Sequence, residues 1–157
     1  MVSIALFLMS AVGCSSKRVL PDSPGPFQRY TEEIVMHSEI LGTDVKFGVL
    51  LPESYRDEAD RRYPVVYMLH GYGDTHLSWN GKYLHANTRI QALEGKGLSE
   101  MIYIFPAGYN SYYCNFYNGK YNYMDMFTEE LVPYVDKSFR TLADRGHRAL
   151  TGYSMGG

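Results

Sequence analysis

The chain has 157 residues, 45% of them hydrophobic, and its 17 acidic and 15 basic residues give a formal net charge of −2. This length fits one domain, and the composition is ordinary for a globular protein. The sequence contains no basic run, and the charges between Arg56 and Arg62 mix both signs, so we expect a solvated loop there and no nucleic-acid partner.

The N-terminus resembles a bacterial lipoprotein signal. Residues 1–13 carry no charged side chain and end in small residues directly before Cys14. Since the run is too short to span the roughly 30 Å hydrocarbon core of a bilayer, we expect a signal peptide over residues 1–13 rather than a transmembrane helix. Cys14 would then carry the lipid and anchor an exported protein to the cell envelope. The alternatives are a secreted or periplasmic protein with an ordinary secretory signal, or a frayed apolar N-terminus.

Residues 14–27 have the composition of a linker, with Pro21, Pro24, Gly25 and Pro26 and little apolar periodicity. They would tether a folded domain, residues 28–157, to the membrane. The only other cysteine is Cys114, so acylation of Cys14 excludes an intrachain disulfide.

The folded part opens with strand-like segments at 33–37 and 44–51, and Gly42 between them predicts an antiparallel hairpin. Three further runs are typical of strands buried on both faces of a parallel sheet. They cover residues 65–69, 101–105 and 148–151.

Two helices are expected between these runs. The first covers 86–98, with Gly95 and Gly97 as stop signals, and the second covers 124–139, where apolar residues recur at spacings of three and four. Pro133 predicts a kink or a restart in the second helix. The alternation of strand and helix predicts an α/β fold: the N-terminal half of a mostly parallel sheet with helices on both faces.

The C-terminal motif, residues 152–157, reads GYSMGG and contains a G-x-S-x-G directly after a strand-like run. In a nucleophile elbow the serine occupies a strand-to-helix turn so sharp that the positions two before and two after it must be glycine. The motif therefore predicts Ser154 as a nucleophile. It also predicts that the Met155 amide, with the positive end of the following helix, faces a developing oxyanion.

A second sharp turn follows the first buried run at His70-Gly71-Tyr72-Gly73-Asp74. We expect the backbone amide of Tyr72 to be the second oxyanion donor. His70 stands at a strand end, where it could be taken for a base. We expect it instead to brace the turn by hydrogen bonding.

Taken together, these segments resemble the esterase D branch of the α/β-hydrolases, which includes feruloyl esterases, S-formylglutathione hydrolases and mycolyltransferases. The similarity covers most of the chain from about residue 44: VLLPESY, YPVVYMLHGYG with Trp79 after it, FPAGYNSYYCN, MDMFTEELVPYVDKSF and the terminal GYSMGG. The resemblance implies Ser154 as nucleophile and the Tyr72 and Met155 amides as oxyanion donors. We expect neither a cofactor nor a metal.

The segment 105–115 is most similar to feruloyl and related carbohydrate esterases, in which this loop borders the site. In this chain Ala107 stands where the family usually has an acidic residue, and Tyr112 stands where tryptophan is common. We expect Tyr112, Tyr113 and Asn115 to bind the substrate, because aromatic faces stack on sugar or phenolic rings and amides bond their hydroxyls. The alternative is a tyrosine-rich surface loop without a ligand.

In the family, the triad acid and histidine follow the serine along the chain. All five histidines of this sequence precede Ser154. We therefore expect the front part of an esterase domain, truncated just after the elbow, which is inactive by itself and leaves the strand before Ser154 as an unprotected edge.

Three functions are compatible with these residues. The first is a serine carboxylesterase that acts on carbohydrate-linked or small acyl esters through an acyl-enzyme on Ser154. The second is an acyltransferase in which a sugar hydroxyl replaces water. The third is a surface glycan-binding pseudoenzyme that keeps the aromatic loop without a complete triad.

Overall fold

The computed structural model describes residues 27–81 and 84–157. The predicted signal peptide, Cys14 and almost all of the predicted linker lie outside this part of the chain. The described residues form a five-stranded sheet of order β1-β2-β4-β3-β5. The strands are β1 (Tyr30–Ser38), β2 (Thr43–Leu50), β3 (Val65–Leu69), β4 (Ile102–Pro106) and β5 (Arg148–Gly152).

The predicted opening hairpin is confirmed. β1 and β2 pair antiparallel, and Gly42 in their turn has a φ of 64°. β1 begins three residues before the predicted strand and carries a register shift between Thr31 and Ile34. Glu130 holds the turn, since its Oε1 accepts hydrogen bonds from the amides of Glu39 at 2.9 Å and Ile40 at 3.0 Å.

β2 pairs antiparallel with β4, whereas β4, β3 and β5 run parallel, so the sheet is mixed. The β3 and β4 runs are buried as predicted. The same prediction is wrong for β5, where Leu150 is 64% exposed. Among the described residues β5 pairs with β3 alone, so it lies at an edge of the sheet, as we expected for the strand before Ser154.

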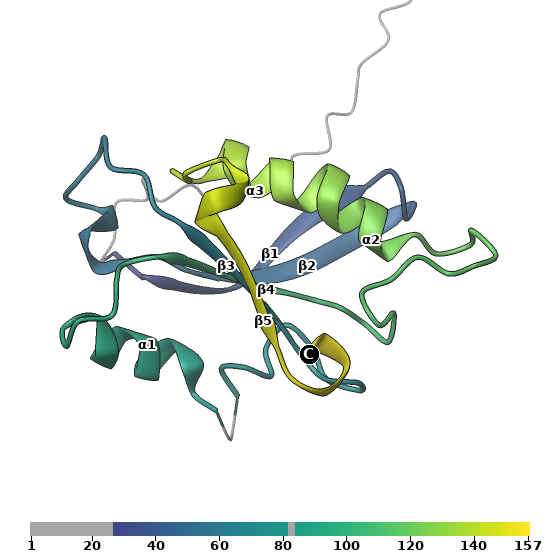
Figure 1. Cartoon of the computed structure of the whole chain (residues 1–157), viewed down its shortest axis with the longest axis horizontal. Coiled ribbons are helices and arrows are strands. Elements are labelled where there is room, and N and C mark those ends of the chain that lie inside the picture. Colours follow the sequence, from purple (N-terminus) through teal and green to yellow (C-terminus); the bar gives the residue numbers. More distant parts are fainter. Residues whose placement is uncertain (1–26, 82–83) are drawn as a thin grey trace, which may run out of the picture.

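Helices cover both faces of the sheet (Figure 1). α1 (Ala86–Glu94) ends four residues earlier than predicted, at the cap residue Gly95. The second predicted helix consists of α2 (Tyr123–Asp125), a π-helical segment (Met126–Leu131) and α3 (Val132–Ser138). The irregularity expected at Pro133 is the π-helical segment that precedes it. Pro133 itself lies in the first turn of α3, where a residue needs no backbone amide donor. Short 3₁₀ turns cover Glu53–Tyr55, Arg145–His147 and Ser154–Gly156.

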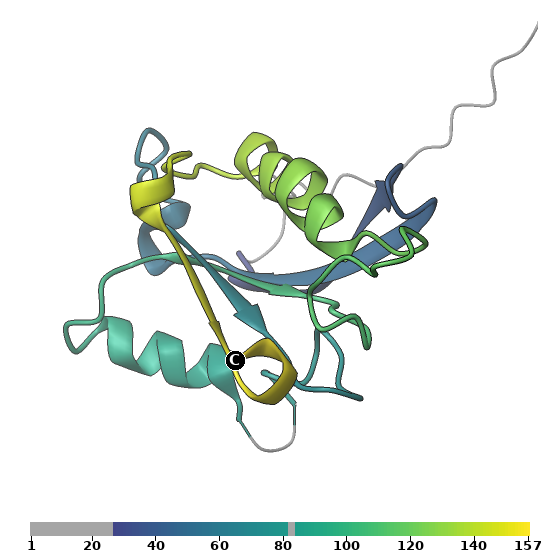
Figure 2. The same ribbon diagram turned by 45° about the vertical axis from the view of Figure 1, so that its right-hand side comes forward.

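Each face of the sheet has its own apolar core. The larger core lies between the sheet and α2–α3 and includes Phe47, Tyr67, Ile104, Leu131 and Val135. The smaller core lies against α1, which Figure 2 shows on the opposite side of the sheet. The α/β architecture predicted from the sequence is confirmed. Within the described residues, no helix has the length and apolarity needed to cross a bilayer.

Candidate active site

The chain leaves β5 through a sharply bent turn at Ser154. Tyr153 is still extended, with φ −138° and ψ 152°, whereas Ser154 has a φ of 53°. A non-glycine residue in this left-handed region costs on the order of 1 to 3 kcal/mol, so the surrounding structure must enforce it. The backbone of Ser154 thus has the strained conformation expected of a nucleophile elbow.

The two glycines of the motif are required by close backbone packing. A Cβ atom on Gly152 would overlap the carbonyl oxygen of Gly156, and one on Gly156 would lie 2.5 Å from the carbonyl oxygen of Leu69. The turn after β5 therefore folds back against its own start and against the end of β3. Only residues without side chains fit at both positions.

The turn after β3 lies beside this elbow. The parallel pairing of β3 and β5 ends at Leu69 opposite Gly152, and Tyr72 and Met155 each follow three residues later. Their amides therefore emerge at the same carboxyl edge of two adjacent strands. Among residues 27–81 and 84–157, neither amide donates a hydrogen bond to another group. The arrangement leaves both of them available to bind an oxyanion.

Two contacts hold the turn after β3 in shape. The Asp74 amide bonds the Gly71 carbonyl at 3.2 Å, and the Gly73 amide donates to Oδ1 of Asn110 at 2.9 Å. Gly73 itself has a φ of 78°. Sequence reasoning missed Asn110, because nothing in the pattern of this loop indicates which of its polar side chains reaches the neighbouring turn.

His70 is fully buried and braces this edge of the sheet, as predicted. Its Nε2 accepts a hydrogen bond from the Gly108 amide at 2.8 Å, so Nδ1 carries the proton and donates to the Gly71 carbonyl, also at 2.8 Å. Burial lowers the pKa of His70. A neutral imidazole thus joins the turn after β3 to the loop after β4.

The loop after β4 is unusually strained. Tyr109, Tyr112 and Tyr113 all have left-handed φ angles, between 50° and 55°. Tyr112 is 61% exposed, and its ring centroid lies 5.9 Å from that of Tyr72, which is 60% exposed. These two rings form an aromatic surface beside the turn after β3.

The other two residues predicted to bind substrate are engaged within the protein. The Tyr113 hydroxyl donates to the His70 carbonyl at 3.1 Å, and its ring occupies the space where a Gly108 side chain would lie. Asn115 donates to Oδ1 of Asp125 at 2.7 Å and accepts from the Asp125 amide at 3.2 Å. Of the three predicted residues, Tyr112 presents the most exposed face.

An open cavity of about 720 Å³ adjoins the elbow on the side of the loop that follows β3. Its apolar lining includes Leu77, Trp79 and Leu84, together with the ring of Tyr153. In the described part of the chain, no cluster of three or more histidine, cysteine or acidic residues could hold a metal ion. No histidine of that part hydrogen-bonds Ser154.

Sequence comparison identifies the family of this chain. Residues 38–157 match the family model described as "Putative esterase". An endo-1,4-beta-xylanase/feruloyl esterase of Xylanibacter ruminicola is 31% identical over 135 residues, which are 80% of this chain and 18% of that protein. An esterase of Mycobacterium tuberculosis is 31% identical over 121 residues, which are 74% of this chain and 25% of that protein.

Solved structures give the same result. A ferulic acid esterase superposes with a TM-score of 0.73 at 30% identity, over 81% of this chain and 50% of that one. A ferulic acid esterase of the fungus Anaeromyces mucronatus gives 0.66 at 27% identity, over 87% and 54%. The chain thus spans about half the length of these structures and a quarter or less of the curated relatives. It belongs to this esterase family and has the α/β-hydrolase fold.

Proposed function

We propose that the protein carrying this chain is a serine carboxylic-ester hydrolase with Ser154 as its nucleophile. The observation that carries the proposal is the left-handed backbone of Ser154 at the carboxyl end of β5, between two glycines that admit no side chain. Such strain persists where the surrounding structure enforces it, and it clusters at active sites. Membership of the esterase family supports the same assignment.

In the proposed reaction, a general base takes the proton of the Ser154 hydroxyl as its oxygen attacks the ester carbonyl. The tetrahedral oxyanion is bound by the amides of Tyr72 and Met155, each contributing about 3 kcal/mol of transition-state stabilisation. Collapse expels the alcohol and leaves an acyl group on Ser154. Water then releases the acid.

We propose a phenolic or other small acyl ester carried by a carbohydrate as the substrate. The exposed rings of Tyr72 and Tyr112 offer flat faces for stacking. Several relatives are feruloyl or ferulic acid esterases by name, and one structure of the fungal enzyme is a complex with ferulic acid. Tyr113 and Asn115 then support the loop that presents Tyr112.

The same aromatic surface favours a second candidate, a glycan-binding protein without catalysis. An acyltransferase of the same fold forms the same acyl-enzyme and differs only in passing the acyl group to a sugar hydroxyl. Product analysis in the presence of xylo-oligosaccharides separates these functions. Free acid indicates hydrolysis, acylated sugar indicates transfer, and binding without turnover indicates a pseudoenzyme.

The test of the nucleophile uses the natural protein that carries this chain. We expect hydrolysis of p-nitrophenyl acetate, covalent labelling of Ser154 by a fluorophosphonate, and loss of both in Ser154→Ala. Ser99→Ala is the matched control, because Ser99 is exposed and lies between α1 and β4. Full turnover in Ser154→Ala, or a label on another serine, would contradict the assignment.

We also propose that Cys14 is lipid-modified and that residues 15–27 tether the domain to the cell envelope. Metabolic palmitate labelling in a bacterial host tests this. Cys14→Ser should abolish the label and release the protein from the membrane fraction, whereas Cys114→Ser should change neither. Label retained in Cys14→Ser would refute the proposal.

A further inference from the structure

Tyr153, the residue directly before Ser154, joins the two segments that carry the proposed oxyanion donors. Its hydroxyl donates a hydrogen bond to Oδ2 of Asp74 at 2.6 Å. Asp74 closes the turn after β3, because its backbone amide donates a hydrogen bond to the Gly71 carbonyl. One side-chain hydrogen bond therefore connects the elbow to the turn that contains Tyr72.

The Tyr153 ring is held by specific packing. A Cβ atom on residue 71 would lie 2.8 Å from Cε2 of Tyr153, so the ring fits against the turn only because that residue is glycine. Trp79 packs against the same ring edge to face, with centroids 5.0 Å apart. Burial raises the pKa of the Tyr153 hydroxyl, and the hydrogen bond to Asp74 raises it further. The hydroxyl therefore stays protonated at neutral pH and donates this hydrogen bond.

No backbone hydrogen bond joins residues 70–74 to residues 153–157 in the described structure. Beyond the last strand pair, Leu69 and Gly152, the spacing of the Tyr72 and Met155 amides therefore depends on packing and on side chains. The Gly73 amide is tied to Asn110 in the loop after β4. Without the Tyr153 hydroxyl, the turn would stay tied to that loop but lose its polar link to the elbow.

We infer that the Tyr153–Asp74 hydrogen bond is a positioning clamp, which fixes the distance between the two amides that bind the oxyanion. The inference rests on the proposed function. Two donors must both lie about 2.7 to 3.1 Å from the oxyanion. A misplacement of about 1 Å costs about 100-fold in rate, so a clamp at this position acts on the transition state and not on substrate binding.

The test is Tyr153→Phe in the natural protein that carries this chain, because phenylalanine keeps the ring and removes the hydroxyl. We expect kcat for p-nitrophenyl acetate to fall about 10- to 100-fold while KM changes less than about 2-fold. Tyr134→Phe is the matched control, because Tyr134 lies in α3 and packs against Phe47 in the larger core, away from the elbow. It should leave kcat unchanged.

Asp74 variants test the acceptor. Asp74→Asn keeps an acceptor oxygen and should retain most of kcat, whereas Asp74→Ala should match Tyr153→Phe. The double variant Tyr153→Phe with Asp74→Ala should lose little more than either single variant, because both remove the same bond.

The possible outcomes separate the clamp from the proposed function. If the natural protein shows Ser154-dependent turnover and Tyr153→Phe retains full kcat, the clamp alone is overturned. If the natural protein has no such turnover, the proposed function fails, and the clamp fails with it. A fall in kcat that is matched by an equal loss of folded protein also overturns the clamp, since a purely structural role predicts that result. The fluorescence of Trp79 measures the fraction of folded protein.

Discussion

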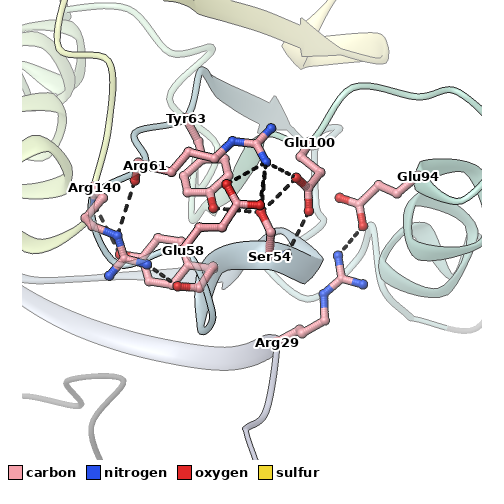
Figure 3. A network of polar contacts seen from close by, with 9 residues as sticks. Arg29, Ser54, Glu58, Arg61, Tyr63, Glu94, Glu100 and Arg140 are labelled. Atoms are coloured by element: carbon pink, nitrogen blue, oxygen red, sulfur yellow. Dashed lines mark hydrogen bonds and ion pairs between the residues drawn. The ribbon is translucent and has the colours of Figure 1, made fainter.

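The two ends of the parallel strands differ in backbone strain and in the pairing of their polar side chains. At the carboxyl ends of β4 and β5, four non-glycine residues, Tyr109, Tyr112, Tyr113 and Ser154, have left-handed backbones. At the amino ends of β3 and β4, Figure 3 shows a network of polar side chains that contact one another. The Ser54 hydroxyl lies 2.8 Å from both the Tyr63 hydroxyl and Oε2 of Glu100.

Glu100 is the centre of this network. Its Oε1 accepts from the Ser54 amide at 2.7 Å, and its Oε2 pairs with Arg61 at 2.8 Å. Burial raises the pKa of Glu100, but the bonds from Ser54 and the charge of Arg61 outweigh burial and lower the pKa overall. Close by, the Arg140 guanidinium lies 3.7 Å over the Tyr55 ring, and Arg29 pairs with Glu94 (Figure 3).

The comparison indicates that one edge of the sheet serves function and the opposite edge serves stability. Ligands of open α/β sheets bind at the carboxyl ends of strands, and here that edge holds the strained and exposed residues. The opposite edge holds polar side chains that form ion pairs and hydrogen bonds with one another, although Oε1 of Glu94 has no partner among the described residues. We therefore expect substitutions at the amino edge to change stability alone, and substitutions at the elbow to change activity.

Gly152→Ala should have the largest effect on stability, because its methyl group would overlap the carbonyl oxygen of Gly156. We expect a loss of about 3 kcal/mol or more in the free energy of unfolding, measured in urea. Gly95→Ala is the control, since nothing lies within 4 Å of its Cβ position and its φ is −68°. Equal stabilities of the two variants would contradict the close packing at the elbow.

Glu100→Gln tests the amino edge. It removes the ion pair with Arg61 and weakens the acceptor of two bonds from Ser54, so we expect a loss of about 2 kcal/mol in unfolding free energy and unchanged kcat/KM. In Glu58→Gln the loss should stay below about 0.5 kcal/mol, because Glu58 pairs with Arg61 at the exposed surface. A marked fall in kcat/KM for Glu100→Gln would show that the amino edge also contributes to activity.

Stability should fall as the pH is lowered through the range in which histidines titrate. Burial lowers the pKa of His70 in the folded state. The unfolded chain therefore takes up a proton first, and the contribution of His70 is full above the unfolded pKa of about 6.5 and is lost as the pH falls towards the folded pKa. His76, whose pKa burial also lowers, acts in the same direction, whereas the exposed His37, whose pKa the hydrogen bond to Asp44 raises, acts in the opposite direction.

We expect the free energy of unfolding to be lower at pH 5 than at pH 7. His70→Gln should flatten this dependence, measured by urea unfolding at each pH, but not remove it, because His76 remains. The same slope in the variant as in the natural protein would contradict the burial of a neutral His70.

Ser154→Gly should have the smallest effect on stability, and with the opposite sign. Glycine adopts a φ of 53° without strain, so we expect a gain of about 0.5 to 1 kcal/mol in unfolding free energy together with loss of turnover. Ser154→Ala keeps the strain and should show no gain. A loss of stability in Ser154→Gly would show that the Ser154 backbone is not strained.

Much of the fold was predictable because periodicity and glycine punctuation act locally. The hairpin at Gly42, the strands β3 and β4 and the cap of α1 at Gly95 follow from neighbouring residues alone. The exposure of β5 depends on which strands lie beside it, so the same apolar pattern that correctly predicts burial of β3 fails there. The π-helical turn before Pro133 depends on how the backbone absorbs the missing amide, which the sequence leaves open.

The candidate site was predictable in part. The elbow geometry and the bracing role of His70 follow from the motif, because tight turns restrict which residues fit. The partners of Tyr113, Asn115 and Asp74 were not predictable, since each bond joins segments that are distant in the chain or depends on a side-chain direction. The catalytic roles of Ser154, Tyr72 and Met155 stay predictions.

A reciprocal comparison of two serines tests whether activity resides at the carboxyl edge of the sheet and stability at the amino edge. Ser154→Ala and Ser54→Ala each remove one hydroxyl, at opposite ends of the parallel strands. We expect Ser154→Ala to abolish kcat/KM and to leave the unfolding free energy unchanged. We expect Ser54→Ala to lower the unfolding free energy by about 1 to 2 kcal/mol and to leave kcat/KM unchanged. Turnover retained in Ser154→Ala, or lost in a folded Ser54→Ala protein, would contradict this division between the two edges.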